Sequence, residues 1–176
     1  MRFEETEIPG CVVVHPERHE DARGYFARTW DGAVLAQRGL NPAVAQCSVS
    51  FNRKRGTLRG MHYQAPPHEE AKLVRCTRGA VFDVCLDLRP DSPSFRRWVG
   101  VELTAENGVA LYVPEGCAHG FLTLADDTEV FYMISAPYAP VAARGVRWND
   151  PAFGIAWPAE VTVIHERDAG YEDWAA

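Results

Sequence analysis

The chain has 176 residues, 47% of them hydrophobic, which is typical of one folded domain rather than a disordered chain. We therefore expect residues 1–176 to form a single domain. The formal net charge of −6 argues against a nucleic-acid-binding protein. Five cysteines without a CxxC pair, a start without an apolar signal segment and the lack of a membrane-length apolar run predict a cytoplasmic protein with reduced thiols.

Apolar residues alternate with other residues along most of the chain, which is the pattern of β-strands. In segment 80–88, residues 82, 84, 86 and 88 take one face, and residues 81, 83, 85 and 87 take the other. Many short strands separated by Gly- and Pro-containing turns predict an all-β sandwich or barrel, a class that includes jelly rolls and whose open end can hold a ligand. Further strands are expected over residues 7–16, 46–52, 72–79, 108–114 and 128–135.

Helix signals are few. Residues 30–39 read as one short helix, with Asp31 as N-cap and Gly39 as C-cap. Residues 166–174 can hold a last helical turn or two.

The segment RGTLRGMHYQ, residues 55–64, sets arginines, a histidine and a glutamine among glycines. A histidine held on a strand in a cleft is suited to act as a general base, and nearby arginines are suited to hold an anionic substrate. Arg59 and His62 have opposite parity, so strict alternation would place them on opposite faces of a strand. A bulge at Gly60 would turn both to the same side.

Further along the chain, four polar residues complement His62. Lys72 follows a Pro-containing loop, so a hairpin-like return would bring it beside His62. His119 comes just after a Pro-x-Gly turn, and Tyr132 is flanked by apolar residues, as an inward-facing strand residue would be. Asp168 is a short carboxylate that can orient an imidazole. Each of these residues, taken alone, is equally compatible with a structural role, and only their combination points to acid–base chemistry.

The segment PEGCAHGF, residues 114–121, fits the second half of the cupin signature PxGxxH. In metal-binding cupins the first half carries two histidines as HxH, whereas this chain has His62-Tyr63-Gln64. Two separate imidazoles without a thiolate make a poor zinc or iron site, although Glu69 and Glu70 offer substitutes. We expect no metal; a metal-dependent cupin oxygenase is the alternative.

The chain resembles the dTDP-4-dehydrorhamnose 3,5-epimerase family of cupin-type sugar-nucleotide epimerases. The resemblance implies a cupin-type jelly-roll barrel with a few short helices, a homodimer, and neither metal nor organic cofactor. The segments that carry it run in family order across nearly the whole chain: residues 21–26, 55–64, 72–79, 83–95, 114–121, 130–138 and 147–158.

The resemblance also implies roles for individual residues. His62 would be the general base, Asp168 its orienting partner, Tyr132 the general acid, and Lys72 the group beside the sugar's carbonyl oxygen. The implied substrate-binding residues are Arg59 and His119 near the sugar and pyrophosphate, Tyr138 near the sugar, Gln46 near the nucleotide, and Arg23 and Phe26 on the nucleotide, often from the neighbouring subunit.

Two positions depart from the family pattern. The chain has Gln46-Cys47-Ser48 where the family often has Gln-Asp-Asn, and Arg28 where it often has Glu. Both places lie near the nucleotide in relatives, so the base and the exact sugar stay open. A single-centre epimerase, acting at carbon 3 or 5 alone, is a further alternative. A catalytically silent sugar-binding protein is disfavoured, because binding alone would not require this acid–base set.

Overall fold

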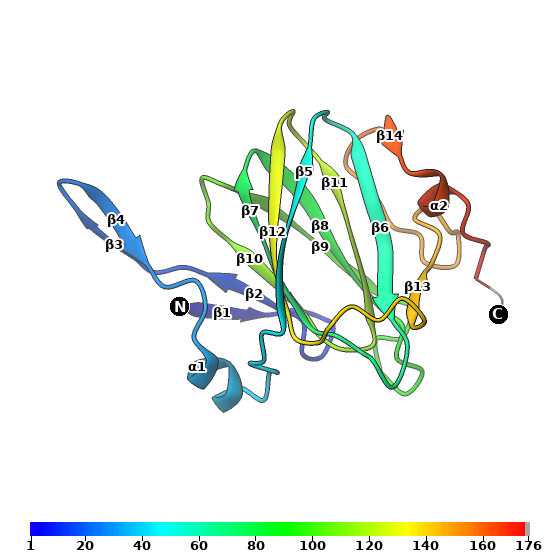
Figure 1. The fold of residues 1–176 in the computed structure, drawn as a ribbon, viewed down its shortest axis with the longest axis horizontal. Coiled ribbons are helices and arrows are strands. Elements are labelled where there is room, and N and C mark those ends of the chain that lie inside the picture. Colours follow the sequence, from blue (N-terminus) through cyan, green and yellow to red (C-terminus); the bar gives the residue numbers. More distant parts are fainter. Residues whose placement is uncertain (175–176) are drawn as a thin grey trace.

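The computed structural model describes residues 1–174, which form two β-sheets that face each other (Figure 1). Strands that are far apart in sequence lie side by side in both sheets, and all neighbours run antiparallel except β14 beside β6. The first sheet contains, in spatial order, β1 (Arg2–Glu5), β2 (Val12–His15), β10 (Ala110–Val113), β7 (Lys72–Arg78), β12 (Thr128–Ile134) and β5 (Gln46–Asn52). The second contains β13 (Ala143–Gly145), β6 (Thr57–Gln64), β11 (Cys117–Thr123), β8 (Ala80–Asp87) and β9 (Trp98–Thr104), with β14 (Val163–Ile164) attached to β6.

The alternation read from the sequence corresponds to the two faces of these sheets. In β8, Val81 and Cys85 belong to the core between the sheets, while Val84 and Leu86 pack under the segment 146–157 on the outer face of the second sheet. The outer face of the first sheet is covered in part by helix α1 (Gly32–Gln37), whose Leu35 is buried there. The predicted all-β class with few, short helices is confirmed.

Two local predictions need correction. The strand expected over residues 7–16 begins only at Val12, because residues 8–11 form a turn in which Cys11 N donates to Ile8 O and Gly10 has a φ of +81°. Asp31 is the N-cap of α1 as predicted, but the C-cap is Arg38 rather than Gly39. The helical turn expected within residues 166–174 is confirmed as α2 (Glu166–Ala169), which ends at the C-cap Gly170.

A hairpin formed by β3 (Arg18–Asp21) and β4 (Gly24–Ala27) projects away from the two sheets (Figure 1). It carries Arg23 and Phe26, and the Phe26 side chain is 68% exposed. Of the five cysteines, all free thiols, only Cys47 is exposed. Within residues 1–174, neither helix has the length and apolar character needed to cross a membrane.

Candidate active site

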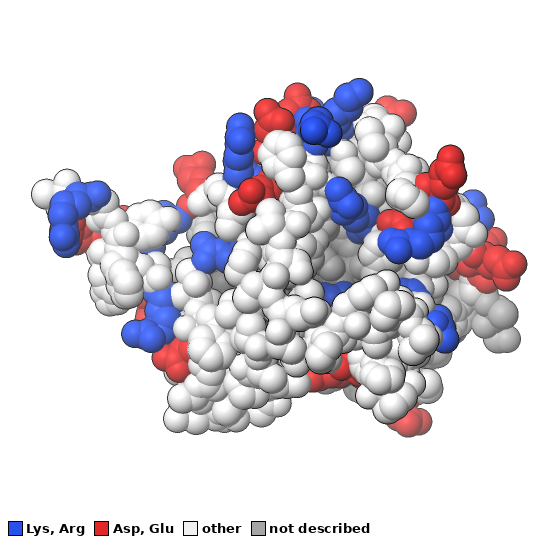
Figure 2. All heavy atoms as spheres, in the orientation of Figure 1, with Lys and Arg blue, Asp and Glu red and all other residues white. Residues whose placement is uncertain are grey.

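A cavity of about 840 Å³ is lined by side chains from both sheets and from the segment 163–171. Its wall is rich in cations, because Arg59, Lys72, Arg144 and Arg167 all line it. Lys and Arg side chains lie around the hollow on the face drawn in Figure 2. A cavity of this size with this charge suits an anionic ligand larger than a single sugar.

A β-bulge at Gly60 shapes the β6 side of the cavity. Three steps along β6, from Arg59 to His62, match only two along β11, from Phe121 to His119. The extra residue is a β-bulge, and Gly60 within it has a φ of +147°. A Cβ at Gly60 would lie 2.6 Å from the Cα of Gly120, so only glycine fits. Arg59 and His62 therefore both line the cavity, and the predicted bulge is confirmed.

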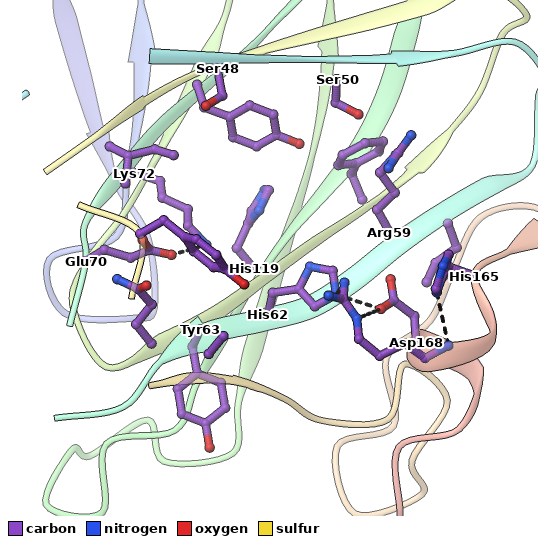
Figure 3. Close-up of a pocket in the computed structure, with 18 of the residues that line it drawn as sticks. Ser48, Ser50, Arg59, His62, Tyr63, Glu70, Lys72, His119, His165 and Asp168 are labelled. Atoms are coloured by element: carbon purple, nitrogen blue, oxygen red, sulfur yellow. Dashed lines mark hydrogen bonds and ion pairs between the residues drawn. The ribbon is translucent and has the colours of Figure 1, made fainter. Parts of the chain in front are cut away.

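His62 points into the cavity and is paired with Asp168 from α2 (Figure 3). Its Nε2 lies 2.8 Å from Oδ1 of Asp168, which is only 2% exposed. Oδ1 also accepts a hydrogen bond from Arg167 Nε at 3.0 Å, and Oδ2 accepts one from the backbone N–H of Gly60 at 3.2 Å. The bulge therefore supplies a donor to the carboxylate that orients the imidazole.

Burial alone would raise the pKa of the Asp168 carboxyl, but the interactions with His62, Gly60 and Arg167 outweigh it and lower the pKa to about 2. Asp168 is therefore ionised at neutral pH. Two groups meet Nε2 of His62: the ionised Asp168 carboxylate at 2.8 Å, which favours a proton there, and Nη2 of Arg167 at 3.1 Å, which can only donate. We assign the tautomer from the nearer carboxylate, with the proton on Nε2. The unprotonated nitrogen of the neutral ring is then Nδ1, which is free to accept a proton.

Lys72 faces His62 from the opposite sheet. The hairpin-like return expected between them is wrong, because β6 and β7 belong to different sheets and the two side chains meet across the cavity. Lys72 Nζ lies 2.9 Å from Oε1 of Glu70, and both side chains are largely buried. The ammonium group is thus held inside the cavity wall with a carboxylate next to it.

His119 and Tyr132 form the inner wall. His119 Nε2 lies 2.8 Å from Oδ1 of Asp83, and Asp83 is fully buried. The rings of His119 and Tyr132 meet edge to face, with centroids 5.9 Å apart. Desolvation, reinforced by the negative charge of Asp83, raises the pKa of the Tyr132 phenol well above its ordinary value. Tyr132 thus brings a neutral hydroxyl group to the cavity that His62 lines from the other sheet.

The remaining predicted site residues fall into two groups. Gln46, Arg59 and Tyr138 line the cavity, but Gln46 Oε1 also accepts a hydrogen bond from Tyr138 N at 2.8 Å. Gln46 therefore anchors the loop that carries Tyr138. Arg23 and Phe26 do not line this cavity and lie exposed on the projecting hairpin.

Three residues that pair with the predicted ones were not identified in that role from the sequence: Glu70, Asp83 and Arg167. Asp83 had a usable signal, because a carboxylate on the inward face of an apolar strand requires a partner. Arg167 directly precedes Asp168, which places it on the same short helix. Among residues 1–174, no group of three or more His, Cys, Asp or Glu side chains is arranged to hold a metal ion.

A two-sheet barrel whose cavity holds an oriented imidazole, a lysine and a neutral phenol defines an enzyme of acid–base chemistry. The family model for dTDP-4-dehydrorhamnose 3,5-epimerase matches residues 5–176. The epimerase of that name from Sinorhizobium fredii is 42% identical over 170 residues, covering 96% of this chain and 87% of the relative.

Solved structures agree with this match. The dTDP-4-dehydrorhamnose 3,5-epimerase of Elizabethkingia anophelis superimposes with a TM-score of 0.95 at 34% identity, covering 99% of this chain and 96% of that one. ChmJ, a 3′-monoepimerase from Streptomyces bikiniensis in complex with dTDP-quinovose, gives a TM-score of 0.87 at 37% identity, covering 96% and 85%. The chain belongs to the dTDP-4-dehydrorhamnose 3,5-epimerase family. The predictions of a cupin-type fold and of a sugar-nucleotide epimerase, an isomerase, are confirmed.

Proposed function

We propose that this protein inverts carbon 3, carbon 5 or both in a 4-keto-6-deoxyhexose linked to a nucleotide, with dTDP as the nucleotide. One observation carries the proposal. His62 and Tyr132 line one cavity from opposite sheets, so a sugar ring between them has a proton acceptor on one face and a proton donor on the other. The dTDP-linked sugars in the names of the relatives support the choice of nucleotide.

The chemistry begins with the ketone at carbon 4, which acidifies the protons on carbons 3 and 5. Nδ1 of neutral His62 takes one of these protons, while ionised Asp168 keeps Nε2 protonated and stabilises the imidazolium that forms. The electron pair moves to the carbonyl oxygen, where the Lys72 ammonium stabilises the enolate charge.

Inversion requires that the proton return from the opposite face. Tyr132 is suited to this step, because its hydroxyl group stays protonated and it lines the cavity from the sheet opposite to that of His62. The same residues serve carbon 3 and carbon 5, since only the position of the sugar ring decides which C–H bond faces His62. Arg59 and His119 line the cavity from the sheet that also carries His62. They are suited to bind the sugar and the pyrophosphate.

The test is proton exchange in heavy water with a panel of nucleotide-linked 4-keto-6-deoxy sugars, in which carbons 3 and 5 are followed by NMR. We expect deuterium incorporation with inversion at one or both carbons, fastest with the dTDP-linked sugar. If no sugar of the panel exchanges a proton at either carbon, the proposed function is wrong. Exchange at carbon 3 alone would identify a single-centre epimerase.

We further propose that the protein is a homodimer in which the β3–β4 hairpin completes the partner's cavity. In one chain the hairpin exposes Tyr25 and Phe26 and does not contact its own cavity, which supports a contact with a second copy. Light scattering should give twice the mass of the chain, and Arg23→Ala should raise KM for the nucleotide sugar. A monomer at micromolar concentration would contradict this proposal.

Two more proposals concern the whole chain. We propose that residues 1–176 work as one domain, which the core shared by both sheets supports. We also propose a cytoplasmic location, which the five free thiols support.

A further inference from the structure

Glu70 contributes a carboxylate to the cavity wall that the reaction described above does not use. Its Oε1 lies 2.9 Å from Lys72 Nζ, and the two side chains are only 11% and 10% exposed (Figure 3). Taking both charges of this pair out of water costs free energy that their attraction offsets only in part, so the pair requires an explanation beyond surface charge.

The local backbone places the two side chains next to each other. Glu70 and Lys72 are separated by one residue, so both point into the cavity, while Ala71 is buried on the opposite side. Ala71 N donates to Ser135 Oγ at 2.8 Å, and Ser135 N donates to Ala71 O at 3.0 Å. These two hydrogen bonds tie the segment to the end of β12. They therefore fix the backbone from which the Glu70 side chain extends.

Lysine differs from arginine in that its ammonium group is a compact charge on a flexible stem of four carbons. Such a side chain does not hold one position without a partner. In the proposed reaction, Lys72 stabilises the enolate only if Nζ stays beside the oxygen on which the charge develops. An anchored carboxylate at hydrogen-bond distance meets this requirement before the substrate arrives.

We propose that Glu70 is a positioning residue that holds the ammonium group of Lys72 at the place where the sugar's carbonyl oxygen binds. This inference rests on the proposed function. Glu70 does not touch the reacting atoms and acts only through Lys72. The competing role, in which the Glu70 carboxylate binds a sugar hydroxyl group directly, predicts a different kinetic result.

The test is a double-mutant cycle of Glu70→Gln and Lys72→Met, with deuterium exchange at carbons 3 and 5 as the measured reaction. Glu70→Gln keeps the size of the side chain and removes its charge. We expect kcat for exchange to fall about 10- to 100-fold, because a misplaced catalytic group costs roughly that much, while KM changes little. In the double variant, removing Glu70 should add no loss to that of Lys72→Met. The matched control is Glu69→Gln, which removes a neighbouring carboxylate that does not line the cavity and should behave as the wild type.

A second readout does not depend on activity. The chain has only two lysines, Lys54 and Lys72, so ¹³C-labelled lysine gives two Cε signals, and Lys54→Arg assigns them. We expect Glu70→Gln to move the Lys72 signal and leave that of Lys54 in place, and Glu69→Gln to move neither.

Several results would overturn the inference: a kcat unchanged in Glu70→Gln, a rise in KM alone, losses that add in the cycle, or an unmoved Lys72 signal. If Glu70→Gln does not fold, Glu70→Asp carries the same test, since a shorter carboxylate should draw Lys72 back and lower kcat, and an unchanged kcat refutes the idea. Failure of the proposed function is distinguishable, because the wild type would then exchange no proton with any sugar of the panel.

Discussion

Replacing Asp168 by asparagine should lower both activity and stability, and the stability loss should depend on pH in a defined direction. The interactions of Asp168 lower its pKa from the ordinary 3.8 to about 2. At about 1.4 kcal/mol for each tenfold change in the proton equilibrium, this corresponds to roughly 2.5 kcal/mol of folding free energy at neutral pH. Because the folded-state pKa is the lower one, this contribution is complete above about pH 5 and is lost as the pH falls toward 2.

Urea unfolding of the wild type and Asp168→Asn at pH 7, 4 and 2.5 measures this contribution. We expect a difference of about 2–3 kcal/mol at pH 7 that shrinks steadily at the two lower values. Glu166→Gln, an exposed carboxylate on the same helix, is the matched control and should change stability by less than about 0.5 kcal/mol. Exchange at carbons 3 and 5 should fall about 10²- to 10⁴-fold in Asp168→Asn. A loss of stability that stays constant from pH 7 to 2.5 would refute the assignment of this energy to the ionised carboxylate.

Other changes have equally specific outcomes. His62→Asn should abolish deuterium exchange and epimerisation together, whereas Tyr132→Phe should keep exchange but return the proton with retained configuration; inversion at the wild-type rate would exclude Tyr132 as the acid. The raised pKa of Tyr132 means that above pH 10 the unfolded chain loses its phenol proton before the folded protein does, so stability should decline there, and less so in Tyr132→Phe by urea unfolding. Gly60→Ala should cost roughly 2–5 kcal/mol and reduce exchange, because a Cβ would lie 2.6 Å from the Cα of Gly120; near-wild-type unfolding would mean that the bulge relaxes without strain.

Much of the fold follows from the sequence because successive side chains of a strand point to opposite faces of its sheet, so the two environments alternate along the chain. The alternation in segment 80–88 separates the inner side chains Val81 and Cys85 from the outer ones, and β8 has this arrangement. Asp31 marks the start of α1 because its carboxylate accepts hydrogen bonds from Ala33 N and Val34 N. The end of α2 has a local signal as well, since Gly170 is its C-cap and donates its N–H to carbonyl groups of the helix.

Most residues named from the sequence line the cavity, but Arg23 and Phe26 do not, and the arrangement of the others was less predictable. Strict alternation along β6 would place Arg59 and His62 on opposite faces of the strand. Gly60 between them indicated that a bulge turns both to the same side, as β6 does. Which strands face each other across the cavity is a property of the sheet order, and no local pattern encodes that order. For this reason the sequence indicated that Lys72 meets His62 but suggested a hairpin, whereas the two residues approach from separate sheets.

Two of the carboxylates that pair with the predicted polar side chains were not identified in that role from the sequence, although they can be found by a physical argument. His119 and Tyr132 were predicted, but Asp83, which hydrogen-bonds to His119 and raises the pKa of Tyr132, was not. A fully buried carboxylate is unfavourable unless a donor or cation meets it, so an aspartate on the inward face of an apolar strand implies a polar partner in the core. The same reasoning applies to Glu70 beside Lys72. Such a carboxylate therefore predicts a polar partner but not a place in the cavity, because Asp87, fully buried on the same strand as Asp83, is paired with Arg89 away from the cavity.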